Sequence, residues 1–222
     1  MNMGDVGQTS ASRPARPYRS PRRQEQARRT RQRILAAARA EFLASGYAGT
    51  TMRAVATAAG VALPTLELSV GTKGRLLKEV IDVAIAGDDQ PVPVLDRPWA
   101  AEAEAAGTVE DFLRRVAAVL VPAQERSARL VVVALEAADA DPALAPVGRQ
   151  LLEQRTTTAA WVTDGIARRT ALRAGIDRDH AVDTVWLLMD PVVFCRLTAD
   201  RGWGAERYGR WFVDGLQRLL LP

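Results

Sequence analysis

The chain has 222 residues, of which 48% are apolar and 25% charged, so it can fold around a core and is not disordered throughout. It has one cysteine, one histidine and no glycine-rich phosphate loop, so we expect no intrachain disulfide, no metal cluster, no cofactor and no enzymatic activity. Residues 1–45 hold ten arginines against three acidic residues, so the positive charge of the chain is concentrated at its N-terminal end. Such a basic end suits a polyanionic partner. The alternative is a solvated segment that binds nothing.

Residues 1–23 are rich in arginine, proline, glycine and serine and nearly free of apolar residues, so we expect them to form a disordered arm. This arm lacks the apolar stretch of a signal peptide. No part of the chain approaches the roughly 20 successive apolar residues that cross a bilayer. We therefore expect a cytoplasmic protein without a membrane partner.

Residues 24–87 show the periodicity of four helices, beginning with an apolar stripe that Gly46 ends. Thr50 and Thr51 supply capping hydroxyls for a short second helix. Gly60 then starts a turn of about three residues before a third short helix, and a fourth helix continues to residue 87. Two short helices joined by a tight turn behind a basic segment are typical of a helix-turn-helix, whose second helix enters the major groove of DNA.

The remainder of the chain divides into an irregular segment and a second helical unit. Residues 88–107 contain several prolines and no periodicity, which predicts a linker. Residues 108–222 again show helical spacing, and we expect a kink at Pro191 in the penultimate helix. No segment alternates as a strand does, so the predicted fold is all-α with about nine helices.

Two groups of residues resemble a known family. The first lies within residues 31–81 and comprises Arg33-Ile-Leu-Ala-Ala-Ala, Gly46-Tyr47, Thr50-Thr51-Met52-Arg53, Val55-Ala56, Ala59-Gly60-Val61 and Thr72-Lys73. The second comprises Trp186-Leu-Leu-Met-Asp-Pro and Arg201-Gly-Trp203. Together they resemble the TetR family of transcriptional regulators. The resemblance implies an N-terminal three-helix helix-turn-helix domain and a C-terminal helical domain that binds a small organic effector and dimerises. It also implies a homodimer that represses transcription from a pseudo-palindromic operator in double-stranded DNA.

The resemblance also implies which residues contact DNA. Thr51 begins the second helix, where its hydroxyl and the backbone N–H groups can hold a phosphate, and N-capping alone is the alternative. Arg53 is expected to contact a phosphate or a base, unless it is simply solvated. Lys73 carries a positive charge at a helix N-terminus, where the positive end of the helix dipole repels it. A DNA phosphate beside Lys73 would explain this placement. The reading surface comprises Ala62, Leu63, Pro64 and Thr65, with one polar group for the bases.

The third helix departs from the family pattern. Ala62 stands where a serine cap is usual, and Glu67 and Ser69 stand where tyrosines usually contact the DNA backbone. A carboxylate facing a phosphate is repulsive by about 1 kcal/mol at about 4 Å in water. We therefore expect weaker backbone contacts, unless Glu67 accepts a hydrogen bond from a cytosine amino group.

An arginine-rich arm is our hypothesis for how these contacts are replaced. It places four arginines against phosphates or an adjacent minor groove, namely Arg22, Arg23, Arg28 and Arg29. The alternative is a TetR-like protein that has weakened or lost specific DNA binding and acts as a ligand-binding or protein-interaction module.

Large apolar residues of the C-terminal unit are the candidates for an effector site, because such sites combine apolar walls with a few polar groups. The candidates are Trp161, Trp186, Met189, Phe194, Cys195 and Trp203. The alternative for each of them is an ordinary place in the core.

Overall fold

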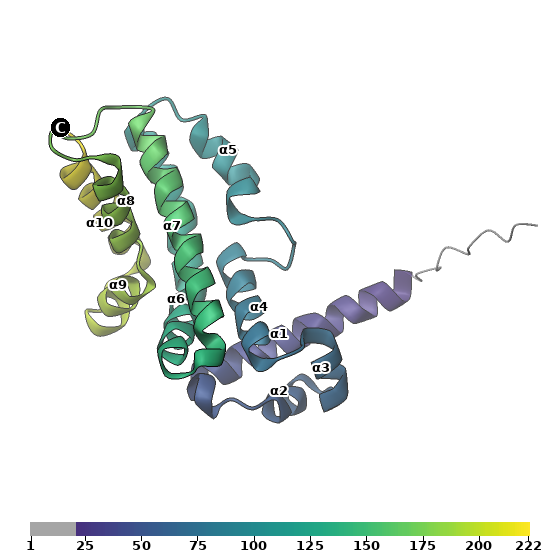
Figure 1. Ribbon diagram of the computed structural model, residues 1–222. Helices are drawn as coiled ribbons and strands as arrows, with labels where there is room; N and C mark the ends of the chain where they lie inside the picture. The colour runs from purple at the N-terminus through teal and green to yellow at the C-terminus, as the bar shows by residue number, and fades with distance from the viewer. Residues whose placement is uncertain (1–20) are drawn as a thin grey trace, which may run out of the picture.

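The computed structural model describes residues 21–222, and within them the chain is helical with no strand, which confirms the predicted all-α fold of about nine helices (Figure 1). The expected disorder of residues 1–20 lies outside the described residues. Residues 21–23 form the first turn of α1, which corrects the expected start of order at Gln24. The elements are α1 (Pro21–Gly49), α2 (Met52–Ala59), α3 (Leu63–Val70), α4 (Lys73–Ala86), η1 (Val94–Asp96), α5 (Pro98–Glu104), α6 (Val109–Ala140), η2 (Pro142–Leu144), α7 (Ala145–Ala167), α8 (Arg178–Leu188), α9 (Pro191–Cys195), η3 (Arg196–Asp200) and α10 (Ala205–Leu220).

The first apolar core lies among α1, α2, α3 and α4. Phe42 of α1, Leu66 of α3 and Ile81 of α4 are fully buried in it. The first turns of α1 extend away from the rest of the molecule (Figure 1). Gly46 interrupts α1 with a φ of 64°, as the sequence predicted, and one more helical turn follows it.

Helix α6 joins the two halves of the molecule, because it contributes to both cores. Its C-terminal part places Leu130 and Ala134 in the first core with α1 and α4. Its N-terminal part places Phe112 and Leu113 in a second core with α5, α7, α8 and α10. In Figure 1, α6 and α7 run from the helix-turn-helix end toward the opposite end of the molecule, with α8, α9 and α10 on one side and α5 on the other.

The segment predicted as a linker contains regular structure. Prolines break the periodicity of residues 88–97, but residues 98–104 form α5, which corrects the prediction of an irregular crossing over that stretch. Pro98 occupies the first turn of α5, where its missing N–H costs nothing. Ala100, Ala103 and Ala106 are buried, and α5 contacts α6.

Pro191 ends the helix rather than kinking it. Helix α8 stops at Leu188, the Asp190 carboxylate accepts a hydrogen bond from the Val192 N–H, and α9 starts at Pro191. No helix within residues 21–222 has the length and hydropathy needed to cross a membrane.

Candidate functional site

The turn between α2 and α3 has the geometry of a helix-turn-helix. Gly60 adopts φ 63° and ψ 42°, and its N–H donates to the carbonyls that end α2. The backbone at this position lies in the left-handed region, which glycine adopts without cost and which is unfavourable for residues with a side chain. The Val61 N–H donates to the Ala56 carbonyl, so the turn is closed before α3 begins at Leu63.

The two threonines before α2 have different roles. The Thr51 Oγ1 accepts from the Ala54 N–H at 3.0 Å, so Thr51 is the N-cap, and its side chain is exposed. The Thr50 hydroxyl instead donates to the Gly46 carbonyl at 2.7 Å and is buried. The prediction that both threonines cap α2 is therefore wrong for Thr50, which closes the end of α1.

The ammonium group of Lys73 is held by the C-terminal end of α1. Its Nζ donates to the carbonyl oxygens of Tyr47 and Thr50 at 2.9 and 3.0 Å and lies 4.0 Å from the centroid of the Tyr47 ring. These carbonyls explain a cation at the N-terminus of α4 without a phosphate beside it. Burial raises the pKa of the Tyr47 hydroxyl. Arg53, by contrast, is exposed, and its guanidinium has no partner in the described part of the chain.

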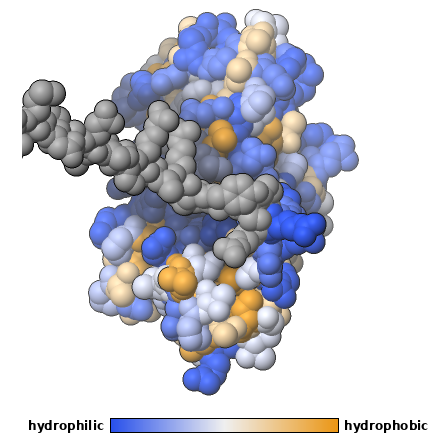
Figure 2. All heavy atoms as spheres, turned by 90° about the vertical axis from the view of Figure 1, so that its right-hand side faces the viewer, coloured by the Kyte–Doolittle hydropathy of each residue, from blue (hydrophilic) through white to orange (hydrophobic). Residues whose placement is uncertain are grey.

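Helix α3 presents a face of mixed apolar and polar residues to solvent. Leu66 and Val70 are buried, whereas Ala62, Pro64, Thr65, Glu67 and Ser69 are exposed. Ala62 makes no side-chain capping bond, as the sequence predicted. Leu63 is half-buried and packs against the first core, so it is less available to bases than its neighbours. Figure 2, which faces the side where α3 lies, shows apolar groups among hydrophilic ones on its lower part.

Leu68 is the α3 residue that sequence reasoning missed. Its side chain is 91% exposed, the largest exposure among the large apolar residues that the structure describes. The signal was present in the sequence, because burial of Leu66 and Val70 at i and i+4 places Leu68 on the opposite side of the helix. Apolar side chains can contact thymine methyl groups in the major groove, so Leu68 is a further candidate for the reading surface predicted from the sequence.

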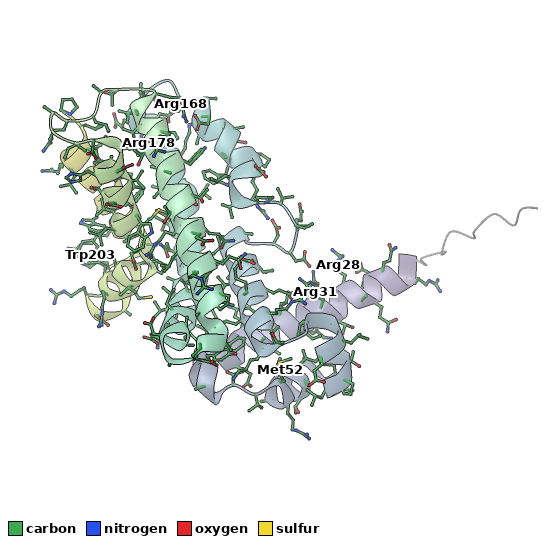
Figure 3. All side chains as sticks on the ribbon, in the orientation of Figure 1. Arg28, Arg31, Met52, Arg168, Arg178 and Trp203 are labelled. Carbon is green, nitrogen blue, oxygen red and sulfur yellow. The ribbon has the colours of Figure 1, made fainter. Side chains whose placement is uncertain are left out.

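Arg28, one of the predicted arm arginines, lies on the part of α1 that extends away from the rest of the molecule (Figure 3). Arg28 and Arg29 are exposed, and each lies 2.9 Å from a Glu25 carboxylate oxygen. The hydrogen bonds from Arg29 and Arg28 lower the pKa of Glu25. Arg22 is exposed in the first turn, and the side chain of Arg23 lies outside the described residues.

A cavity of about 810 Å³ lies between the N-terminal helices and the C-terminal unit. Its walls come from α4, α6, α7 and the segment 89–99, with single contributions from α1, α9 and α10 and from Met189, which follows α8. Apolar residues form one part of the wall, among them Trp99, Val116, Leu120, Val162 and Phe212. Both the size and the apolar wall suit a small organic molecule.

Met189 lines this cavity, but the other five predicted effector residues do not. Trp161 lies behind the wall, with its ring centroid 5.4 Å from that of Trp99. Trp186 also lies behind it, under the guanidinium of Arg155. Phe194 and Cys195 join a small separate cluster around Tyr208, and Trp203 contacts Trp211 at the outer edge of the C-terminal helices (Figure 3).

Two polar residues of the cavity wall, Arg155 and Gln124, and two that lie behind it, Asp190 and Tyr208, were not predicted from the sequence. Arg155 lies 2.6 Å from Asp190, and the Gln124 side-chain N–H donates to the Met189 carbonyl at 2.6 Å. The Tyr208 hydroxyl donates to the Leu188 carbonyl at 2.9 Å, and burial raises the pKa of this hydroxyl well above its usual value. These contacts stabilise the break between α8 and α9, whose carbonyls lack the partners of a continuous helix.

Comparisons with known proteins agree with this geometry. Residues 34–80 match the model of the family described as bacterial regulatory proteins, tetR family. No sequence among curated proteins matches the chain.

Several solved structures share the fold. The transcriptional regulator FadR from Bacillus subtilis, solved in complex with stearoyl-CoA, is 17% identical with a TM-score of 0.64, over 84% of this chain and 97% of FadR. A protein from Saccharomonospora viridis, solved in complex with choline, is 16% identical with a TM-score of 0.63, over 90% and 99% of the two chains. A TetR-like transcriptional regulator from Rhodococcus sp. RHA1 is 17% identical with a TM-score of 0.57, over 85% and 94%.

Proposed function

We propose that this chain, which has a tetR-family N-terminal domain and the fold of TetR-family transcriptional regulators, is a cytoplasmic DNA-binding repressor. It binds a pseudo-palindromic operator as a homodimer and is released by a small organic ligand. The observation that carries this proposal is that a single helix, α4, connects α3 with the cavity. Helix α4 contacts α3 and also forms part of the cavity wall.

The DNA-facing surface consists of α3 and the start of α2. Thr51 and Arg53 stand at the N-terminus of α2, where a free guanidinium and the positive end of the helix dipole favour a phosphate. The exposed side of α3 then reads the major groove with Pro64, Thr65 and Leu68, which supply apolar contact and one hydroxyl. Specificity from such a surface rests mainly on thymine methyl groups.

Homodimerisation is supported by exposed apolar residues on the C-terminal helices. Leu187 of α8, Val192 of α9 and Leu219 of α10 are 57%, 42% and 50% exposed. Large apolar side chains gathered on the last helices of one unit suit an interface that a second copy covers with the same residues. A twofold axis through this interface sets the spacing of two reading helices and hence of two operator half-sites.

Ligand binding reaches the DNA-binding domain through direct contacts. The cavity wall includes Arg31 of α1, which pairs with Glu79 of α4 at 2.9 Å (Figure 3). Nearby, the Arg126 guanidinium of α6 donates to the carbonyls of Ala84 and Ile85 at the end of α4. The Arg39 guanidinium of α1 donates to the Arg126 carbonyl. A ligand that shifts α6 therefore acts on α1 and α4 together.

Selection of bound fragments from a genomic library, followed by gel shifts at stated salt, tests the proposal. We expect enrichment of a pseudo-palindrome and a shift that Arg53→Ala weakens about tenfold, with a reduced salt dependence. Arg114→Ala is the matched control, because Arg114 is exposed on α6 away from α2 and α3. If no fragment shifts, the chain is instead a ligand-binding or protein-interaction module with the same fold.

The arm has its own test. We propose that Arg28 and Arg29 contact phosphates and that residues 1–20 contribute further arginines to the same DNA. The double variant Arg28→Gln, Arg29→Gln removes the two charges and leaves α1 intact, because both side chains are exposed. An unchanged operator affinity and an unchanged salt dependence, both in this variant and after deletion of residues 1–20, would rule out the arm.

A further inference from the structure

Arg155 is a buried cation in the wall of the cavity. Its side chain is only 9% exposed, and a guanidinium nitrogen lies 2.6 Å from the Asp190 carboxylate. Its guanidinium carbon lies 3.5 Å from the centroid of the Trp186 ring, which covers one face of the planar group. The ion pair and the ring hold the guanidinium in one orientation before any ligand arrives.

One donor of this guanidinium has no acceptor. The Nε of Arg155 is buried and has no hydrogen-bond partner among the described residues. A buried N–H of a charged group without an acceptor is unfavourable, and native structures leave few such groups unpaired. Arg155 belongs to the cavity wall, so a ligand that enters the cavity and displaces the groups packed over Nε can supply the acceptor.

We propose that the cavity binds an uncharged, mainly apolar molecule whose carbonyl oxygen accepts a hydrogen bond from Arg155. This inference rests on the ligand-binding part of the proposed function and names the chemical class of the ligand. The carbonyl lies at the polar part of the wall, and the apolar body lies along Trp99, Val116 and Phe212.

A second polar group stands on the same part of the wall. Gln124 donates to the Met189 carbonyl, and Arg155 pairs with Asp190, the next residue along the chain. The two side chains therefore reach adjacent residues at the break between α8 and α9. The Gln124 Oε1 is an acceptor on this wall, so a ligand that carries a hydroxyl or an amide N–H beside its carbonyl gains a further hydrogen bond.

The charges around the cavity explain why the ligand is uncharged. Asp190 already neutralises Arg155, so an anionic ligand would bring an uncompensated negative charge close to the Asp190 carboxylate in a region of low dielectric constant. Of the five other charged residues in the wall, only Arg31 is basic, and four are acidic, namely Glu79, Asp82, Asp89 and Asp96. A cationic head group placed beside Arg155 would in turn be repelled by its guanidinium.

Three probes of equal chain length test the proposal by calorimetric titration of the full-length protein below their micellar concentrations. The probes are 2-undecanone, undecanoate and undecyltrimethylammonium. We expect 2-undecanone to bind at least tenfold more tightly than either charged probe. Tighter binding of undecanoate or of the ammonium probe, or no binding of the ketone, overturns the proposal.

Two variants tie the selectivity to the ion pair. Asp190→Asn keeps an oxygen that can cap α9 and removes the charge that opposes an anion, so we expect undecanoate to bind at least tenfold more tightly than it does to the wild type. Such a gain of affinity cannot come from misfolding. Arg155→Met with Asp190→Asn removes the donor together with its counter-charge, and we expect at least a tenfold loss of ketone affinity. Unchanged affinities in both variants overturn the proposal.

Glu153→Gln is the matched control, because Glu153 is exposed on the same helix and does not line the cavity. Gel shifts on the same preparations separate this inference from the proposed function. If the protein binds DNA but does not prefer the ketone, only the proposed ligand class is wrong. If it binds the ketone but shifts no DNA fragment, the proposed repressor function is wrong and the proposed ligand class is retained.

Discussion

The DNA-facing surface and the wall of the cavity use their polar groups differently. On the surface, Arg53 and Glu67 are exposed and contribute little to holding the fold together. Around the cavity, Gln124 and Tyr208 are buried and satisfy the backbone carbonyls where α8 ends. The contrast predicts that substitutions on the proposed DNA-facing surface change DNA affinity first, whereas substitutions around the cavity change the stability of the fold first.

The largest stability effect is expected deep in the C-terminal unit, at Gly165. A Cβ on this residue would overlap the ring of Phe112, which is itself fully buried. Gly165→Ala should lower the free energy of unfolding by about 3 kcal/mol, because an overpacked core must displace the ring. Urea unfolding measures this loss. Gly107→Ala is the control, since Gly107 is exposed with open space around it, and an equal loss in both variants would contradict the explanation.

A smaller effect is expected at Arg126, where the two halves of the molecule meet. Arg126→Met keeps the apolar stem but leaves the Ala84 and Ile85 carbonyls without their donor. We expect a loss of about 2 kcal/mol in urea unfolding, typical of hydrogen bonds from a charged group. Arg129→Met, on the exposed side of the same helix, should cost less than about 0.5 kcal/mol. Equal losses would show that this junction does not depend on Arg126.

The N-cap of α2 should matter less again. Thr51→Ala removes the acceptor of the Ala54 N–H, and we expect a loss of about 1 kcal/mol. Thr57→Ala, on the same helix, removes an exposed hydroxyl that bonds only to a carbonyl within the helix and should be nearly neutral. Thr51→Ser should restore most of the stability, and DNA affinity that stays low in this variant would assign the threonine a further role at the interface.

The smallest effect lies on the exposed face of α3, and it concerns DNA affinity rather than stability. Glu67→Gln removes a carboxylate that opposes phosphates, so binding to non-specific DNA should tighten about fivefold at low salt, corresponding to about 1 kcal/mol. Glu125→Gln, exposed on α6, is the control. A lower affinity for the selected operator, with altered preference at one base pair, would instead show that Glu67 reads a cytosine.

The helix-turn-helix could be predicted from the sequence because its determinants are local. Gly60 and the N-cap Thr51 lie within a few residues of the elements they limit, and their roles follow from backbone geometry. Helix α5 could not be predicted with the same rule, because Pro91 and Pro98 suggest irregular backbone while small alanines carry the buried face. Packing against α6 stabilises the helix, and this contact between distant residues cannot be inferred from the local sequence.

The cavity wall depended on contacts between distant parts of the chain. Gln124 and Met189 are 65 residues apart, and Arg155 of α7 pairs with Asp190 in the break between α8 and α9. In the sequence, Arg155 looks like a solvated arginine among polar neighbours, and Trp161 and Trp186 look like cavity residues because they are large and apolar. The packing reverses this expectation, since the tryptophans support the wall from behind and the arginine forms part of it.

The length of α1 has a mechanical consequence. Between Pro21 and the interruption at Gly46 the helix is continuous, and its inner part is fixed to α4 and α6 while its first turns are free. A helix of this length measures about 38 Å, so a tilt of about 10° at its inner end moves its tip by about 7 Å. That displacement is close to the rise of two base pairs. In the proposed complex with DNA, helix α1 would thus act as a lever that turns a small rotation beside the cavity into a change of register along the double helix.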